Sequence, residues 1–382
     1  MSEEERERRD AVRAQVDRRR RRRRVVAWCV AGAVVLGIAG WAAEPSVRDK
    51  VITARACDGA IPDGSMDVLR ATTQEPDAHL TDHTTEIRPE LGRYFCQVGS
   101  GRLRVLEVRA YTRRDDIDRE LATEFGDDGG HPRAALPGGL PGFERRIAGI
   151  TLMPPCPGRG KDAAGHPGRL LVEVLGGYPA PAHQLLRTGA AVANKAAERL
   201  GCGGKPLPVP ASEAEPKQVR PAAAAGTSCA ALADVRLPDP VWTAELRIPR
   251  GPAPMASCAL RRPGKDENGE PRDAVVQLYG YYGDFSQRMV LRAARMDGVA
   301  GDRERTGPWL TRSGGWALAR CDGQAAAFQV QGSPRGGAEG DEKTEDGRDL
   351  RDKRKLRDLL ASFAKKESAA RGCEGLRLPS VR

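Results

Sequence analysis

Three side chains in the first quarter of the chain have types that could bind a metal ion. His79 and His83 are four residues apart and Glu86 follows three residues later, so on a helix all three would share one face. The stretch before them is polar and interrupted by Pro76, which argues against a helix, so we favour a solvated loop. All five histidines lie before residue 184, so the second half of the chain cannot repeat any histidine chemistry.

Three tyrosines form the densest aromatic cluster, and they are Tyr279, Tyr281 and Tyr282. On a strand, Tyr281 and Tyr282 point to opposite sides, so they cannot both face one core, and one ring could lie at the surface. A surface platform of this kind would suit a peptide or a glycan. Ordinary packing at the end of a strand is the alternative, and it is the one we favour.

The short motifs of common enzymes are missing from the sequence. The closest pair of cysteines, Cys202 and Cys229, is 27 residues apart, which excludes a zinc ribbon and a dithiol redox motif. The segment 158–162 lacks the spacing and the Ser/Thr of a phosphate loop. There is no G-x-S-x-G elbow and no H-E-x-x-H motif. We therefore assign no catalytic residue and expect no cofactor.

Eight of the nine cysteines form a frame of four that occurs twice. The first set spans 145 residues and consists of Cys57, Cys96, Cys156 and Cys202. The second set spans 144 residues and consists of Cys229, Cys258, Cys321 and Cys373. Each set ends in a Gly-Cys-x-Gly signature that is soon followed by Leu-Pro. This repetition predicts two homologous modules in tandem.

If these eight cysteines lie outside the cytoplasm, as the apolar segment described next predicts, their even number indicates a disulfide framework. The outer cysteines bracket each module and the inner ones lie on predicted strands, so we expect first-to-fourth and second-to-third pairing. The expected bridges are Cys57–Cys202, Cys96–Cys156, Cys229–Cys373 and Cys258–Cys321. Four cysteines allow three pairings, and the sequence alone leaves all three open.

An apolar segment without charges precedes the two modules. Residues 25–43 would span about 28 Å as a helix, close to the thickness of a bilayer core, with Trp28 and Trp41 near its ends. The arginine run 18–24 on one flank places that flank in the cytoplasm. We expect a single-pass anchor, with Cys29 inside the membrane. The alternative is a signal peptide that is cleaved after Ala42.

The predicted organisation follows from these features. It consists of a basic cytoplasmic tail (1–24), a transmembrane helix (25–43), a stalk (44–56), a first module (57–210), a Pro/Ala-rich linker (211–228) and a second module (229–382). We expect the membrane and an unknown envelope protein or ligand as partners. The tail's arginines adjoin the apolar segment, so we do not expect nucleic acid to bind there.

Within each module, hairpins and helices alternate. Residues 94–98 and 103–111 predict a β-hairpin, and residues 183–200 have the apolar stripe of a helix. The second module repeats the order, with a strand at 274–279 and a helix at 350–371. The predicted fold class is α+β: two tandem modules, each a mainly antiparallel sheet covered by helices.

The composition rich in Arg, Ala, Gly and Pro, the anchor and the cysteine-framed modules resemble single-pass envelope proteins of high-GC actinobacteria. The resemblance implies no site residues. Our leading hypothesis is a non-enzymatic, membrane-anchored binding protein outside the cytoplasm. One alternative is an extracytoplasmic hydrolase or metal-dependent enzyme that uses the first module alone. Another is a ligand sensor that acts with a partner chain.

Overall fold

The computed structural model describes residues 28, 46–75, 77–124, 134–145, 149–161, 165–177, 180–211, 217–233, 243–247, 253–261, 274–283, 286–290, 307–311, 313–332 and 353–380. The predicted cytoplasmic tail lies outside these residues, as does the predicted membrane span apart from Trp28. No helix within them is both long and apolar enough to cross a membrane.

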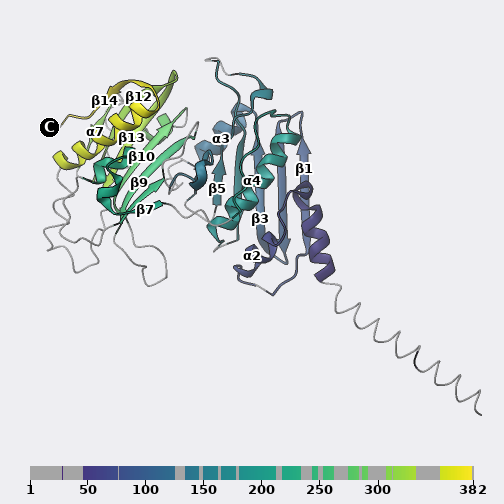
Figure 1. The fold of residues 1–382 in the computed structure, drawn as a ribbon. Helices are drawn as coiled ribbons and strands as arrows, with labels where there is room; N and C mark the ends of the chain where they lie inside the picture. The colour runs from purple at the N-terminus through teal and green to yellow at the C-terminus, as the bar shows by residue number, and fades with distance from the viewer. Residues whose placement is uncertain are drawn as a thin grey trace, which may run out of the picture.

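A six-stranded antiparallel sheet organises the first half of the chain, residues 46–211 (Figure 1). Its spatial order is β1 (Asp82–Arg88), β2 (Arg93–Ser100), β3 (Leu103–Tyr111), β6 (Leu171–Gly176), β5 (Gly149–Leu152) and β4 (Gly142–Glu144). The labelled α-helices of this half are α2 (Ser65–Ala71), α3 (Arg114–Glu124) and α4 (Ala182–Arg199), and residues 46–55 are helical as well. The predicted hairpin is confirmed as β2 and β3, and the predicted helix at 183–200 as α4.

An eight-stranded sheet organises the second half, residues 217–380 (Figure 1). Its order is β11 (Trp309–Leu310), β12 (Gly314–Cys321), β13 (Gln324–Gly332), β10 (Ala274–Tyr282), β9 (Met255–Arg261), β8 (Thr243–Arg247) and β7 (Lys217–Val219). The remaining strand, β14 (Cys373–Arg377), pairs with β12. The long helix is α7 (Lys353–Ala370), and residues 286–290 are also helical.

The two sheets have the same strand order. The series β1, β2, β3, β6, β5, β4 corresponds to β8, β9, β10, β13, β12, β11, and every neighbouring pair is antiparallel. In both halves a helix follows the third strand of the series, and the long helix α4 or α7 follows the fourth. The predicted class of antiparallel sheets with helices is therefore confirmed, and the two sheets fit two modules of one architecture.

Each long helix covers one face of its sheet. Gly189 on α4 allows close approach, because a Cβ there would lie 2.9 Å from Ile150 Cδ1 and 3.0 Å from Val174 Cγ2. Gly201 (φ +67°) follows α4 and Gly372 (φ +62°) follows α7, and glycine adopts this left-handed conformation without steric cost. Each glycine directly precedes a bridged cysteine.

The four disulfides differ from the predicted pairing, which is wrong in both halves. The bridges are Cys57–Cys96, Cys156–Cys202, Cys229–Cys258 and Cys321–Cys373. The strand order explains the difference. Cys96 lies on β2, and β3 and β6 separate that strand from β5, after which Cys156 follows. Three strand spacings amount to about 14 Å, beyond the reach of a disulfide.

The predicted stalk (44–56) and the predicted linker (211–228) both contain residues that belong to the folded halves. Residues 46–55, within the predicted stalk, are helical, and Ile52 and Ala56 belong to the first hydrophobic core. Asp49 on this helix accepts hydrogen bonds from Arg70 Nη1 (2.6 Å) and from the Leu80 amide (2.8 Å). Within the predicted linker, β7 pairs with β8 and Ala224 lies in the second core.

The pairing predicts which double substitutions leave free thiols. In Cys57→Ser/Cys96→Ser both members of one bridge are removed, so a denatured, oxidised sample should contain no free thiol among residues 44–382. Cys57→Ser/Cys202→Ser removes one member of two bridges and should leave two thiols that react with maleimide, counted by mass spectrometry.

The same variants test stability. Loss of the Cys57–Cys96 bridge, which closes a loop of 39 residues, should lower the free energy of unfolding by roughly 4 kcal/mol in the chain-entropy estimate. Two free thiols in Cys57→Ser/Cys96→Ser, and none in Cys57→Ser/Cys202→Ser, would contradict the pairing.

Candidate functional site

The three candidate metal ligands do not converge. His83 and Glu86 lie on strand β1 rather than on a helix, and their odd spacing turns them to opposite faces. His79 precedes the strand, where its Nδ1 lies 2.9 Å from Asp49 Oδ2, while Glu86 accepts a hydrogen bond from Arg88 at 2.8 Å. No group of three potential ligands exists among the described residues. The geometry does not support the metal-site hypothesis.

The three tyrosines of the aromatic cluster are buried on β10, with at most 7% of each exposed. Tyr281 and Tyr282 do point to opposite faces, but both faces of this sheet are covered. Tyr282 belongs to the core beneath α7, where its hydroxyl donates to Glu367 and Arg371 stacks 3.6 Å over its ring. Tyr279 and Tyr281 belong to a different cluster, so a surface platform at these residues is wrong.

That cluster joins the two halves of the chain, because residues of both halves belong to it, and its strand residues lie on the sheet faces opposite the long helices. From the first half it contains Phe143, Met153 and Leu171, and from the second Tyr281 and Trp316. Phe143, Tyr281 and Trp316 are fully buried, and the Tyr281 and Trp316 rings stack with centroids 5.7 Å apart. We call this cluster the shared core.

Charged groups reinforce the contact around the shared core. Arg247 on β8 forms an ion pair with Glu144 on β4, and a second with Glu245 at 2.7 Å. Burial opposes the charge on Arg247, but the two glutamates outweigh it and raise the pKa of the guanidinium. Arg288 approaches Asp118 of α3 at 3.4 Å. These contacts fix the relative position of the two halves.

A cleft of about 540 Å³ opens beside this contact, a volume typical of small-molecule sites. Its walls are α3, the loops that flank β5 and β6, and one side chain from the second half, Gln324. Arg169 Nη2 lies 3.3 Å from Gln324 Oε1, and His166 Nε2 lies 2.6 Å from the carbonyl of Asp322. The cleft therefore draws on both halves of the chain.

Positive charge dominates the lining of the cleft. Its basic residues are Arg113, Arg114, Arg159, Lys161 and Arg169, and its acidic residues are Asp115 and Asp118, an excess of three positive charges. Two of these cations, Arg159 and Arg113, donate to backbone carbonyl oxygens. Arg159 donates to the carbonyls of Leu200 (2.6 Å) and Pro89 (3.0 Å), and Arg113 to that of Glu90 (2.5 Å). A carbonyl cancels no net charge, so these groups keep a field that attracts anions.

Helix α3, one wall of the cleft, is tied to the sheet by a buried carboxylate. Asp116 accepts hydrogen bonds from Arg93 Nε at 2.8 Å, from Arg93 Nη2 at 2.7 Å and from Arg119 Nη2 at 2.8 Å. These hydrogen bonds, those of Arg93 above all, hold the pKa of Asp116 below its usual value despite burial. The ionised carboxylate thus holds α3 in position.

The sequence contained the cleft residues but gave no reason to group them. Arg159 and Lys161 lie in the segment 158–162, which fails as a phosphate loop. The bridge Cys156–Cys202 and the 3-10 helix η3 (Pro157–Arg159) place this segment beside the end of α4. The only signal was the concentration of positive charge after Cys156.

A scan against protein-family profiles, a search of the curated proteins and a search of the solved structures gave no match for this chain.

Replacing the carboxylate that holds α3 should weaken the fold in a pH-dependent way. The folded pKa of Asp116 is below the unfolded value of about 3.9, so its contribution is present above that pH and is lost as the pH falls toward the folded pKa. Asp116→Asn should lower the free energy of unfolding at pH 7 by about 1.5–3 kcal/mol. The difference from wild type should shrink as the pH falls below about 4.

Urea denaturation at a series of pH values measures this effect. The control is Asp115→Asn, an exposed carboxylate on the same helix, which should change the stability by less than about 0.5 kcal/mol. Equal losses in the two variants, or a loss for Asp116→Asn that does not vary with pH, would argue against the role of Asp116.

Proposed function

We propose that this chain is a membrane-anchored extracytoplasmic binding protein that holds an anionic ligand in the cationic cleft of its first half, beside the contact with the second half. The observation that carries the proposal is the excess of three positive charges in a cleft of about 540 Å³. Guanidinium groups bind carboxylates and phosphates with paired, charge-assisted hydrogen bonds. The lining suits recognition of a small, multiply charged anion.

The compartment is supported by the disulfides. All eight cysteines after Cys29 are bridged, and four disulfides fit an extracellular protein stabilised by disulfides. In the proposal the apolar segment 25–43 anchors the chain, with residues 1–24 in the cytoplasm. The helix 46–55 would then connect the membrane to the folded halves without a free stalk.

We further propose that the two halves arose as tandem copies of one module. The shared strand order supports this, and so do the disulfides, which link corresponding elements in the two halves. Cys57 in η1 (Ala56–Gly59) bonds to β2, as Cys229 in η5 (Ser228–Leu232) bonds to β9. In this account the copies have diverged so that only the first contributes a strongly cationic wall.

Neutralising two cations of the cleft should weaken anion binding. With pyrophosphate as the probe, Arg113→Gln/Lys161→Gln should raise the Kd about tenfold, which corresponds to a loss of about 1.4 kcal/mol. Both side chains are exposed, so the fold should be unaffected. Isothermal titration calorimetry of residues 44–382 at low ionic strength measures the change.

The control removes two positive charges from the same half outside the cleft. Arg102 and Lys205 are exposed and do not line the cleft, so Arg102→Gln/Lys205→Gln should leave the Kd nearly unchanged. Absence of saturable binding to the wild type, or equal weakening in both double variants, would overturn the proposal.

The anchor has its own test. The full chain should sediment with membranes and resist extraction by alkaline carbonate, whereas deletion of residues 25–43 should release it. Protease added to intact cells should digest residues 44–382 and leave the basic tail protected. A full chain that is secreted and begins after residue 42 would replace the anchor by a cleaved signal peptide.

A further inference from the structure

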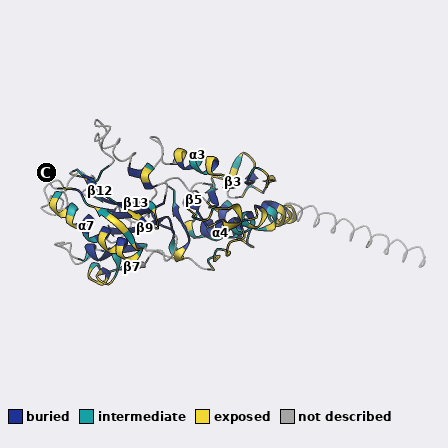
Figure 2. Ribbon diagram, turned by 90° about the horizontal axis from the view of Figure 1, so that it is seen from above, coloured by how far each residue is buried: buried dark blue, intermediate teal, exposed yellow. Residues whose placement is uncertain are grey.

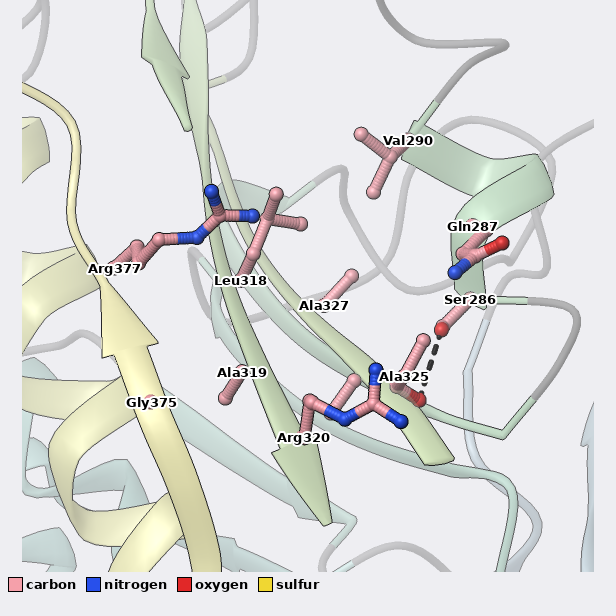
Figure 3. Close-up of a pocket in the computed structure, with 11 residues that line it drawn as sticks. Ser286, Gln287, Val290, Leu318, Ala319, Arg320, Ala325, Ala327, Gly375 and Arg377 are labelled. Carbon is pink, nitrogen blue, oxygen red and sulfur yellow. Dashed lines mark hydrogen bonds between the residues drawn. The ribbon is translucent and has the colours of Figure 1, made fainter. Parts of the chain in front are cut away.

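A second cavity, of about 430 Å³, lies in the second half of the chain (Figure 3). It opens between the helical residues 286–290 and the hairpin of β12 and β13, with β14 along one side. Its position corresponds to that of the cationic cleft, which lies between α3 and the segments of β5 and β6. The two halves thus have cavities at equivalent places in their folds.

The floor of this second cavity is apolar. Ala325 and Ala327 of β13 line it, together with Leu318 of β12 and Val290. Ala327 and Val290 are at least 95% buried and belong to the shared core, so the floor is part of the packed interior rather than a loose surface. Ser286, the polar group nearest the hairpin, donates its hydroxyl to the carbonyl of Ala325 at 3.0 Å and is already satisfied.

Two arginines flank this floor. Arg320 projects from β12 and Arg377 from β14, and both guanidinium groups are exposed (Figure 3). Arg320 donates to the carbonyl of Gly323 at 2.5 Å, and no acidic side chain is among the described residues that line the cavity. The cavity therefore combines an apolar floor with two cations that its own lining does not neutralise.

This combination differs from the cationic cleft of the first half. The cleft has five basic and two acidic residues among its lining, whereas the second cavity has two basic residues above an apolar floor. A small polyanion suits the first, because the charges surround it. An apolar chain with a single anionic end suits the second, because the floor removes the chain from water while the arginines bind the end.

We propose that the second cavity binds an apolar carboxylate, with its chain on the floor formed by β12 and β13 and its carboxylate between Arg320 and Arg377. The proposal goes beyond anion binding in the cleft and does not depend on it. Arginine suits a carboxylate because its planar fork can donate two parallel hydrogen bonds. A volume of about 430 Å³ is within the range of small-molecule pockets.

The test uses decanoate and decanol as a matched pair of probes that differ in charge. All described strands and both cores lie within residues 46–380, so the soluble part, residues 44–382 with its disulfides intact, is titrated by calorimetry. Wild type should bind decanoate at least tenfold more tightly than decanol. Arg320→Gln/Arg377→Gln should remove most of this difference and leave decanol binding within about twofold.

Three further variants test whether the probe needs the space of the cavity, and whether charges elsewhere on the protein affect its binding. Ala325→Leu fills part of the cavity and should weaken both probes. Lys365→Gln/Lys366→Gln removes two exposed charges from α7, outside the cavity, and should change neither. Arg113→Gln/Lys161→Gln should bind decanoate like wild type, which distinguishes this cavity from the cleft.

Three results would overturn the proposal. They are no saturable decanoate binding by wild type, equal affinity of wild type for decanoate and decanol, and undiminished decanoate binding by Arg320→Gln/Arg377→Gln. Near-ultraviolet circular dichroism checks that each variant is folded. If the arginine variant fails to fold, the response of Ala325→Leu decides whether the chain occupies the cavity.

Discussion

One apolar cluster, the shared core, joins the two halves of this protein, and each sheet contributes to it residues from the face opposite its long helix. Helices α4 and α7 cover the other face of each sheet. Burial of large aromatic side chains such as Tyr281 and Trp316 dominates the energetics of such contacts. Residues of both halves belong to this one cluster, and Figure 2 shows buried segments in both halves.

The sheet faces opposite the long helices also contain charged side chains. How these charges are paired bears on where a ligand can bind. Glu107, Glu173 and Glu245 are at most 5% exposed, and each is paired with at least one arginine. A buried carboxylate without a partner would cost several kcal/mol, so such pairs keep the contact specific. In the cleft the basic residues outnumber the acidic ones by three, and Arg113 and Arg159 donate to backbone carbonyls. This excess of positive charge favours the approach of an anion.

The sequence predicted the class of fold because its signals are local. The strand pair at 94–111 and the helix at 183–200 follow from alternation and from an apolar stripe, and both are present. Strand β1 was missed because its seven residues are mostly exposed at the edge of the sheet and have no apolar pattern. Its polar residues can pair only because β2 lies beside them, which no local signal reports.

The sequence could not predict features that depend on the order of the strands or on contacts between the two halves, such as the disulfide pairing and the grouping of the cleft residues. Cys96 and Cys156 looked like partners by position in the chain, but two strands lie between them. Tyr281 and Tyr282 point to opposite faces of β10, and both faces are buried, so the packing favoured from the sequence holds and the surface platform does not. Arg159 joins the cleft through a disulfide and through the end of α4, both distant in sequence.

Calorimetric unfolding of residues 44–382 tests the central claim most directly, since a shared core makes the two halves melt together. Our account predicts one transition whose calorimetric and van't Hoff enthalpies agree. The fluorescence of Trp309 and Trp316, which are both buried in the shared core, should change in the same transition. Two separate transitions, with the tryptophan signal changing in only one, would contradict the account by showing that the halves fold independently.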